Sequence, residues 1–458
     1  MADWHRMTAL EQGRAIGAGT LDPVALTEHM LERIQRLDAD HAVYLCRTTD
    51  RALAEAKSAR VRAKAGSRRG PLDGVPISWK DLIDSAGHPT TGGSGLFRDR
   101  VPSRDAPILA RGSRAGLVCL GKTNLTEFAF SGLGINPIFG TPPNPFDTAT
   151  ARVPGGSSSG AAVSVARGLA AAAVGSDTGG SVRIPAAWNG LVGLKTTAGL
   201  VPIDGVMTLS TTFDTLGPLA RDVADANALH AVLAHRPPAD LAGAMLKGTR
   251  LVVPTDHMLE RVEDGVRAAF EPAVEALARA GATIAREPAP EIVAARELGA
   301  RHGVLAATEC EALWRDAIAR DPKTVFHMVR ERIGAGATAT GRDLYELYEG
   351  YKRLAAALAV RLAGCDAVIA PTVPVDPPAI APLLADDQAY SRANALSLWN
   401  TAPVNWLAGC ALTVPCGGRA LPVGLMLVQR AHREGQLLRL GAAAERALAD
   451  LPKPALAA

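Results

Sequence analysis

Two clusters of glycine and serine form the part of this chain best suited to chemistry. Residues 153–186 read VPGGSSSGAAVSVARGLAAAAVGSDTGGSVRIPA, with one cluster at 155–160 and the other at 175–181. Glycine lets the backbone crowd a reacting group, serine supplies hydroxyls, and neither residue type favours the interior of a helix. The pattern predicts two reactive loops joined by a single alanine-rich buried helix over 161–174.

The second cluster has the composition of a nucleophile loop. Gly175 is placed after the last turn of the expected helix, a position that favours glycine. Ser181 then lies at a glycine-led bend, where the N–H groups of Gly179, Gly180 and Ser181 are free to point inward. Such converging backbone donors are what an oxyanion hole requires.

A serine nucleophile needs a base, and the sequence offers a lysine. No histidine occurs between His88 and His230, so a Ser–His pair could form only between distant segments. Residues 73–79 read as a short apolar strand that places Lys80 at its carboxyl end, where α/β active sites are usually built. Burial beside Trp79 would lower the pKa of Lys80, and a neutral lysine accepts a proton from a hydroxyl.

With these residues the chain resembles the amidase signature hydrolases, whose catalytic set is Ser-cisSer-Lys. The similarity rests on Lys80 in GVPISWKD, Ser157 in GGSSSG and Ser181 in GSDTGGSVRIPA. The two serines are 24 positions apart, a spacing typical of that family. The resemblance covers most of the chain and includes GKTN at 121–124, NPIFG at 136–140, GLK at 193–195, VPCG at 414–417 and LPVG at 421–424.

The resemblance implies a role for each of these residues. Ser181 would be the nucleophile, Lys80 the terminal base, and Ser157, reached through a cis peptide bond, the serine that relays protons between them. The oxyanion and the substrate would be bound by backbone N–H groups of Thr178, Gly179, Gly180 and Ser181. Support by hydrogen bonding would come from Ser158, Asp177 and Arg183, although the last two fit a plain structural ion pair equally well. No metal and no organic cofactor is implied.

Two other motifs match part of the first cluster. GSSSG at 156–160 satisfies G-x-S-x-G, the nucleophile elbow of α/β-hydrolases, which would make Ser158 the nucleophile. That elbow follows a strand, whereas RVPG at 152–155 is poor strand material, and the last histidine, His432, lies in a polar segment. A phosphate-binding loop is disfavoured because GGSSSGAA lacks the Gly-Lys-Ser/Thr ending.

The fold implied by the resemblance is α/β, a large mixed central β-sheet covered on both faces by α-helices. One amidase domain is expected, made of an N-terminal helical segment (1–70), a core (71–235), a variable and mainly helical region (236–363) and a C-terminal part that completes the core (364–458). Short apolar strands are predicted near 74–79, 117–121, 191–195, 249–253, 282–284, 365–370, 411–414 and 423–428. The helical region includes Glu309, and its aromatic residues Trp314, Tyr345 and Tyr348 are interpreted as packing residues, since aromatic side chains at helical spacing usually lie in a core.

The composition narrows the possible partners and compartments. A chain of 458 residues with 48% hydrophobic and 21% charged residues is typical of a globular protein, and a net charge of +3 does not predict nucleic acid as a partner. Its six cysteines have no metal-ligand spacing and indicate reduced thiols. No secretory signal and no membrane-spanning run is recognised. We expect a cytoplasmic protein that acts on a small-molecule amide and has no membrane partner. The sequence is also compatible with a homodimer.

The expected activity is hydrolysis of carboxylic amides through an acyl-enzyme on Ser181. Small aryl or alkyl amides are the first expected substrates, and the same chemistry suits carbamates and esters. One alternative within the resemblance is the glutamine-hydrolysing subunit of a tRNA-dependent amidotransferase. Those subunits usually carry an acidic residue seven positions before the asparagine that corresponds to Asn405, where this chain has Leu398 followed by Trp399. An apolar wall favours a hydrophobic substrate. Another alternative is a non-catalytic relative that acts as a binding or assembly component. The presence of Lys80, Ser157 and Ser181 at the three catalytic positions argues against it.

Overall fold

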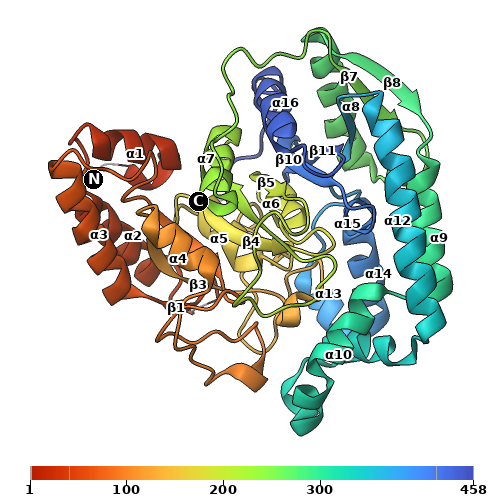
Figure 1. Ribbon diagram of the computed structural model, residues 1–458, viewed down its shortest axis with the longest axis horizontal. Coiled ribbons are helices and arrows are strands. Elements are labelled where there is room, and N and C mark those ends of the chain that lie inside the picture. The colour runs from red at the N-terminus through yellow and green to blue at the C-terminus, as the bar shows by residue number, and fades with distance from the viewer. Residues whose placement is uncertain (1–2, 41, 419, 457–458) are drawn as a thin grey trace.

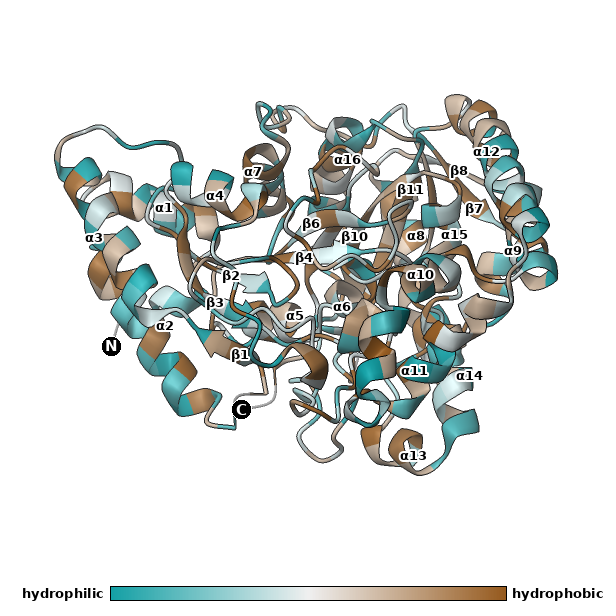
Figure 2. Ribbon diagram, turned by 60° about the horizontal axis from the view of Figure 1, so that its bottom comes forward, coloured by the Kyte–Doolittle hydropathy of each residue, from teal (hydrophilic) through white to brown (hydrophobic). Residues whose placement is uncertain are grey.

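A single mixed sheet organises the molecule. The computed structural model describes residues 3–40, 42–418 and 420–456. Within them, eleven strands are hydrogen-bonded in the order β1-β3-β2-β4-β6-β5-β10-β11-β9-β7-β8, and helices cover both faces (Figure 1; Figure 2). This is the predicted α/β architecture. The strands are β1 (Tyr44–Arg47), β2 (Pro76–Lys80), β3 (Val118–Thr123), β4 (Ala173–Asp177), β5 (Val192–Lys195), β6 (Thr215–Ala220), β7 (Arg250–Pro254), β8 (Thr283–Glu287), β9 (Ala367–Pro371), β10 (Cys410–Gly417) and β11 (Val423–Gln429).

The helices follow the chain around this sheet. In Figure 1 the N-terminal helices lie at the β1 end, and α9 and α12 run side by side at the other end. The α-helices are α1 (Ala9–Gly17), α2 (Pro23–Leu37), α3 (Thr49–Lys64), α4 (Pro107–Arg114), α5 (Ser159–Ala166), α6 (Arg183–Trp188), α7 (Val223–Ala234), α8 (Asp264–Arg279), α9 (Pro290–His302), α10 (Leu305–Arg320), α11 (His327–Gly334), α12 (Gly341–Ala363), α13 (Ile380–Ala385), α14 (Asp387–Ser397), α15 (Ala402–Trp406) and α16 (Glu434–Ala447). No helix in these ranges combines the length and the apolar character that crossing a membrane requires.

Strand β2 occupies the position that brings the predicted base into the interior. It pairs in parallel with β3 on one side and with β4 on the other, where Ser78 is opposite Ala173 and Trp79 is opposite Val174. All five of its residues are buried, as expected for a central strand with helices on both faces. The carboxyl ends of β2 and β4 therefore meet at one edge of the sheet.

The predicted helix over 161–174 is wrong in its second half. Helix α5 ends at Ala166, Gly168 turns the chain with φ +65°, and residues 173–177 form β4. Short side chains such as alanine and valine pack equally well in a buried helix and in a buried strand, so their sequence alone does not distinguish the two. Strand β4 exists because β2 and β6 flank it and pair with its backbone. Gly175, expected after a helix, lies within this strand.

The interpretation of the aromatic residues in the helical region holds only in part. Trp314 packs against Phe97 and Phe128, with ring centroids 5.3 Å and 5.7 Å apart. Tyr345 and Tyr348 are instead 66% and 43% exposed. Both tyrosines lie on α12, whose buried face carries Leu347 and other residues. Helical spacing was therefore a poor guide to which side of this helix faces the core.

Candidate active site

Lys80 lies at the centre of the candidate site. It is the last residue of β2 and has no exposed surface. Its Nζ is 2.6 Å from the Ser157 Oγ and 2.8 Å from the Ser176 Oγ. Burial lowers the pKa of Lys80 to about 7. The negative charges of Asp214 and Asp177 raise this pKa and so offset part of the effect of burial. A lysine in this state can take up and release a proton near neutral pH.

The loop that carries Ser157 is fixed against residues 126–134. The peptide bond between Gly156 and Ser157 is cis. A Cβ atom on Gly156 would lie 2.4 Å from the backbone nitrogen of Gly134, so only glycine fits there. The Gly156 N–H donates to the Gly132 carbonyl at 2.8 Å, and the Ser157 carbonyl accepts from the Thr126 N–H at 3.1 Å. These bonds hold the Ser157 side chain beside Lys80.

Ser181 is brought next to the first serine cluster by hydrogen bonds between the two clusters. The Ser158 N–H donates to the Ser181 carbonyl at 3.3 Å, and the Ser158 hydroxyl donates to the Ser176 carbonyl at 3.2 Å. Ser181 is 4% exposed, and its hydroxyl has no hydrogen bond to any residue in the described ranges. Ser158 thus connects the two serine clusters, and among the described residues the Ser181 Oγ has no hydrogen-bond partner in this conformation.

Asp177, at the end of β4, organises the loop that leads to Ser181. Its carboxylate accepts the N–H groups of Gly180 at 2.8 Å and Val182 at 3.1 Å, and it forms an ion pair with Arg183 at 3.0 Å. The Asn405 Nδ2 also donates to it at 3.0 Å. Burial alone would raise the pKa of Asp177, but the charge and hydrogen bonds of Arg183 hold it well below its usual range. Asp177 and Arg183 therefore form a buried, loop-bracing pair.

This arrangement corrects one predicted oxyanion donor. The Gly180 N–H points to Asp177 and is not free in this conformation. The N–H groups of Gly179 and Ser181 have no internal acceptor within the described ranges. Gly180 is required for another reason: its φ is +140°, and a Cβ atom there would lie 2.2 Å from the Thr401 Oγ1. The close approach of residues 401–402 shapes the loop.

Sequence reasoning missed two polar residues at this site. Ser176 is the second hydroxyl in contact with Lys80, and it was overlooked because residues 173–177 were interpreted as the end of a helix and the turn after it. Asp214 accepts a hydrogen bond of 2.5 Å from the Thr178 hydroxyl and is 7% exposed. Asp214 precedes β6 by one residue, and no local motif marks it. Recognising β4 as a strand would have revealed Ser176, whereas Asp214 required the pairing of β4 with β6.

The nucleophile-elbow interpretation finds no base in the structure. The Ser158 hydroxyl bonds to the backbone of Ser176, and within the described ranges it has no hydrogen bond to a histidine. His432 lies near a different segment, where its backbone N–H donates to the Thr197 hydroxyl at 2.7 Å. Among the described residues, no group of three or more His, Cys, Asp or Glu side chains is arranged to hold a metal ion.

Leu398 forms part of the wall beside the loop. A Cβ atom on Gly179 would lie 3.5 Å from the Leu398 Cδ2, and one on Gly132 would lie 3.3 Å from the Leu398 Cγ. The leucine therefore lies between the loop that leads to Ser181 and Gly132, whose carbonyl accepts the Gly156 N–H. Trp399 packs elsewhere, stacked on His257 with ring centroids 4.6 Å apart.

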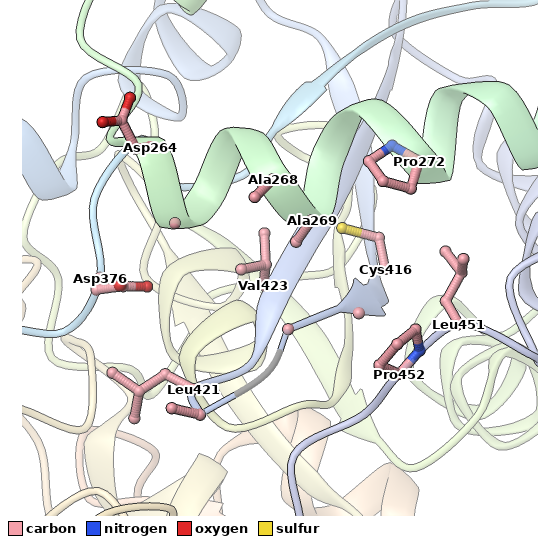
Figure 3. Close-up of a pocket in the computed structure, with 14 residues that line it drawn as sticks. Asp264, Ala268, Ala269, Pro272, Asp376, Cys416, Leu421, Val423, Leu451 and Pro452 are labelled. Carbon is pink, nitrogen blue, oxygen red and sulfur yellow. The ribbon is translucent and has the colours of Figure 1, made fainter.

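An apolar cavity lies outside this constellation. It has a volume of about 610 Å³ and is bounded by α8, the connection between β10 and β11, and residues 451–452 (Figure 3). Its lining is largely apolar and includes Ala269, Val423 and Leu451. Lys80, Ser157 and Ser181 are not among its lining residues. This cavity is therefore separate from the candidate site.

Comparison with known proteins identifies the family. The family model described as Amidase matches residues 25–438. The 2-amino-5-chloromuconic acid deaminase of Comamonas testosteroni is 36% identical over 425 residues, 91% of each chain. One component of the glutamyl-tRNA(Gln) amidotransferase of Chloroflexus aggregans (strain MD-66 / DSM 9485) is 34% identical over 482 residues, 97% of each chain. A crystal structure described as an amidase has a TM-score of 0.87 at 31% identity, covering 96% of this chain and 100% of the other.

These similarities extend over nearly the whole chain and agree with the fold. The chain belongs to the amidase signature family. It is accordingly a hydrolase-family enzyme that acts on carbon–nitrogen bonds of amides. The relatives differ in what their names say they act on, so family membership leaves the substrate open.

Proposed function

We propose that this protein hydrolyses small carboxylic amides through an acyl-enzyme on Ser181, with Ser157 and Lys80 as its proton relay. The observation that carries the proposal is the buried Lys80 amine, 2.6 Å from the Ser157 hydroxyl and with its pKa lowered by burial to about 7. A lysine placed only for structure would normally keep its charge and pair with a carboxylate. Here the two nearest partners are hydroxyls, the groups from which a relay would take a proton.

In the first half of the reaction, the Ser181 Oγ attacks the amide carbonyl carbon. The Ser181 proton passes to Ser157 as the Ser157 proton passes to neutral Lys80. The oxyanion of the tetrahedral intermediate would accept hydrogen bonds from the N–H groups of Gly179 and Ser181, with Thr178 at the start of the same loop. When the carbon–nitrogen bond breaks, Lys80 returns the proton through Ser157 to the departing nitrogen, and the amine leaves.

In the second half, water attacks the ester carbonyl of the acyl-enzyme. The water gives one proton to the relay, and the relay returns a proton to the Ser181 oxygen as the ester bond breaks. The products are a carboxylic acid and an amine, and the enzyme regains its starting protonation state. Esters and carbamates can enter the same sequence because the attacked carbonyl is similar and only the leaving group differs.

The proposed substrate has an apolar group near the reacting carbonyl. Support comes from Leu398, which packs against Gly179 and Gly132 on the wall of the loop. Glutamine hydrolysis for a tRNA-dependent amidotransferase is the second candidate, favoured by the similarity to the amidotransferase component of Chloroflexus aggregans over 97% of each chain. A charged amino group would lack a carboxylate partner at position 398, which is why the apolar amide is preferred.

Two measurements test this proposal. A fluorophosphonate probe should form a covalent adduct on Ser181 in the native protein and none in Ser181→Ala. Steady-state assays with p-nitroanilides, primary amides, aryl carbamates and glutamine should then show turnover of apolar amides by the protein alone. Absence of an adduct on folded protein would contradict the hydrolase and favour a binding or assembly role. Turnover of glutamine only, and only with a partner protein, would favour the second candidate.

A further inference from the structure

The segment 208–214 links the proposed catalytic loop to the helical region of the chain. At its carboxyl end, the Asp214 Oδ1 accepts the Thr178 hydroxyl at 2.5 Å, and the Asp214 Oδ2 accepts the Leu209 N–H at 2.9 Å. Thr178 directly precedes Gly179, one of the residues proposed to bind the oxyanion. The orientation of the Thr178 side chain, and with it the start of the loop, therefore depends on where the Asp214 carboxylate is held.

Glu309 of α10 holds the middle of the same segment. Its carboxylate accepts hydrogen bonds from the hydroxyls of Ser210, Thr212 (2.5 Å) and Tyr348 (2.8 Å). The Ser210 hydroxyl in turn accepts the Phe213 N–H at 3.1 Å, and the Ser210 carbonyl accepts the Asp214 N–H at 3.0 Å. Continuous hydrogen bonds thus run from Glu309 through Ser210 to Asp214 and on to Thr178.

The pattern of contacts at Glu309 is unlike that of an ordinary surface glutamate. Within the described ranges it forms no ion pair, and its oxygens accept hydrogen bonds from hydroxyl groups and from the Thr212 N–H. Trp314, five residues further along α10, also bonds to this segment, because its Nε1 donates to the Thr208 carbonyl at 2.8 Å. Helix α10 therefore contacts both the beginning and the middle of the segment that carries Asp214.

We infer that Asp214 is a positioning residue for the catalytic loop and that Glu309 holds Asp214 in place. This inference rests on the proposed function, because positioning has a consequence only if the loop performs catalysis. It assigns the helical region a part in ordering residues 178–181. The titratable groups whose charges interact with Asp214 are Lys80 of β2 and Cys310 of α10.

The charge of Asp214 gives the inference a second, electrostatic consequence. Burial raises the pKa of Asp214 to about 6, so the carboxylate is ionised at neutral and alkaline pH. Its negative charge favours the protonated form of Lys80 and so raises the pKa of that lysine. Asp214→Asn removes the charge while keeping the shape of the side chain. The pKa of Lys80 should then fall further, and the lysine should remain neutral at more acidic pH.

The test compares Asp214→Asn and Glu309→Gln with the native protein and with Glu297→Gln. Glu297 is exposed on α9, and its side chain has no hydrogen bond or ion pair within the described ranges, so it controls for loss of one carboxylate charge. For each protein, kcat, KM and the rate of fluorophosphonate labelling of Ser181 are measured between pH 5 and pH 9. Amide hydrogen exchange of residues 178–181 is measured on the same samples.

Asp214→Asn should lower kcat about tenfold, the loss expected for one charge-assisted hydrogen bond, while KM changes by less than about threefold. The acidic limb of its pH profile should move to lower pH. Glu309→Gln should lower kcat by about threefold without moving that limb, and both variants should speed exchange at residues 178–181. Thr178→Val should lower kcat as Asp214→Asn does, and Thr178→Ser should recover part of the loss. Glu297→Gln should match the native protein.

The inference is overturned if Asp214→Asn and Glu309→Gln keep the native kcat, the native acidic limb and native exchange. Should Asp214→Asn fail to fold, Glu309→Gln and the Thr178→Val and Thr178→Ser pair decide the question by the same criteria. A native protein that neither labels nor turns over any amide contradicts the proposed function instead, and the exchange of residues 178–181 still reports whether Asp214 and Glu309 order the loop.

Discussion

The clearest test of the proposed base is thermodynamic and needs no substrate. The pKa of Lys80 is lowered by burial to about 7 in the folded protein, against an ordinary value of 10.5. Between these values the unfolded chain binds one more proton than the folded protein does. The free energy of unfolding therefore rises with pH in this interval, by up to about 1.4 kcal/mol for each pH unit. Lys80→Met removes the titrating group and with it this dependence.

The magnitude follows from the two pKa values. At pH 7 the preference of the unfolded state for the proton destabilises the native protein by about 4 kcal/mol, and at pH 9 by about 2 kcal/mol. The difference in unfolding free energy between the native protein and Lys80→Met should thus change by about 2 kcal/mol over this range, with the native protein gaining as pH rises. Contributions from other groups cancel in the difference, to the extent that the variant leaves them unchanged.

The measurement is urea unfolding of both proteins at several pH values from 7 to 9. Lys57→Met is the matched control, because Lys57 is exposed on α3 and has no hydrogen bond or ion pair within the described ranges. Its difference from the native protein should stay constant with pH. A constant difference for Lys80→Met as well would mean that Lys80 is charged in the folded protein. The relay through Ser157 would then lack its base.

Other predictions concern individual parts of the site. Lys80→Met should abolish amide turnover, and the acidic limb of native kcat/KM should have an apparent pKa near 7, since neutral lysine is required and protonation on the acid side removes it. Ser181→Ala should abolish turnover and labelling, while Ser157→Ala should reduce turnover severely but less; an undiminished Ser157→Ala rate rules out the relay. Asp177→Asn should destabilise the protein by about 3 kcal/mol in urea unfolding, because it leaves Arg183 buried without its counter-charge; unchanged stability contradicts the bracing role. Leu398→Asp should raise KM for an apolar amide at least about tenfold, and an unchanged KM would place the substrate elsewhere.

The sequence was most informative where chemistry restricts the choice of residue. Lys80 was predicted at the carboxyl end of a strand because it follows a short apolar run, and α/β active sites are usually built at such ends. The structure places it at the end of β2 with no exposed surface. Gly156 and Gly180 were expected to allow close backbone approach, and a Cβ atom at either position would overlap a neighbour. These predictions depend on local backbone and side-chain properties, which a sequence records directly.

Two of the wrong predictions depend on neighbours distant in the chain, and a third missed a local hydrogen bond. Residues 173–177 could be helix or strand until β2 and β6 are placed on either side of them. The Gly180 N–H was expected to be a free donor, but it donates a hydrogen bond to the side chain of Asp177, three residues earlier in the chain. Tyr348 was expected in the core, and its hydroxyl instead donates to Glu309 near the surface. Partners of this kind are fixed by tertiary structure, and local spacing carries little information about them.

Asp177 and Lys80 are both buried at this site, but their surroundings stabilise different charge states. Asp177 is held ionised because Arg183 and several N–H groups surround it, so its charge state is insensitive to pH near neutrality. Lys80 has hydroxyl partners and only more distant carboxylates, so its charge state is sensitive to pH near neutrality. A side chain that only holds a loop in place works best when its charge stays constant. A side chain that exchanges protons during a reaction must be able to change its charge near neutral pH. On that argument, Asp177 braces the loop and Lys80 is the residue expected to move protons.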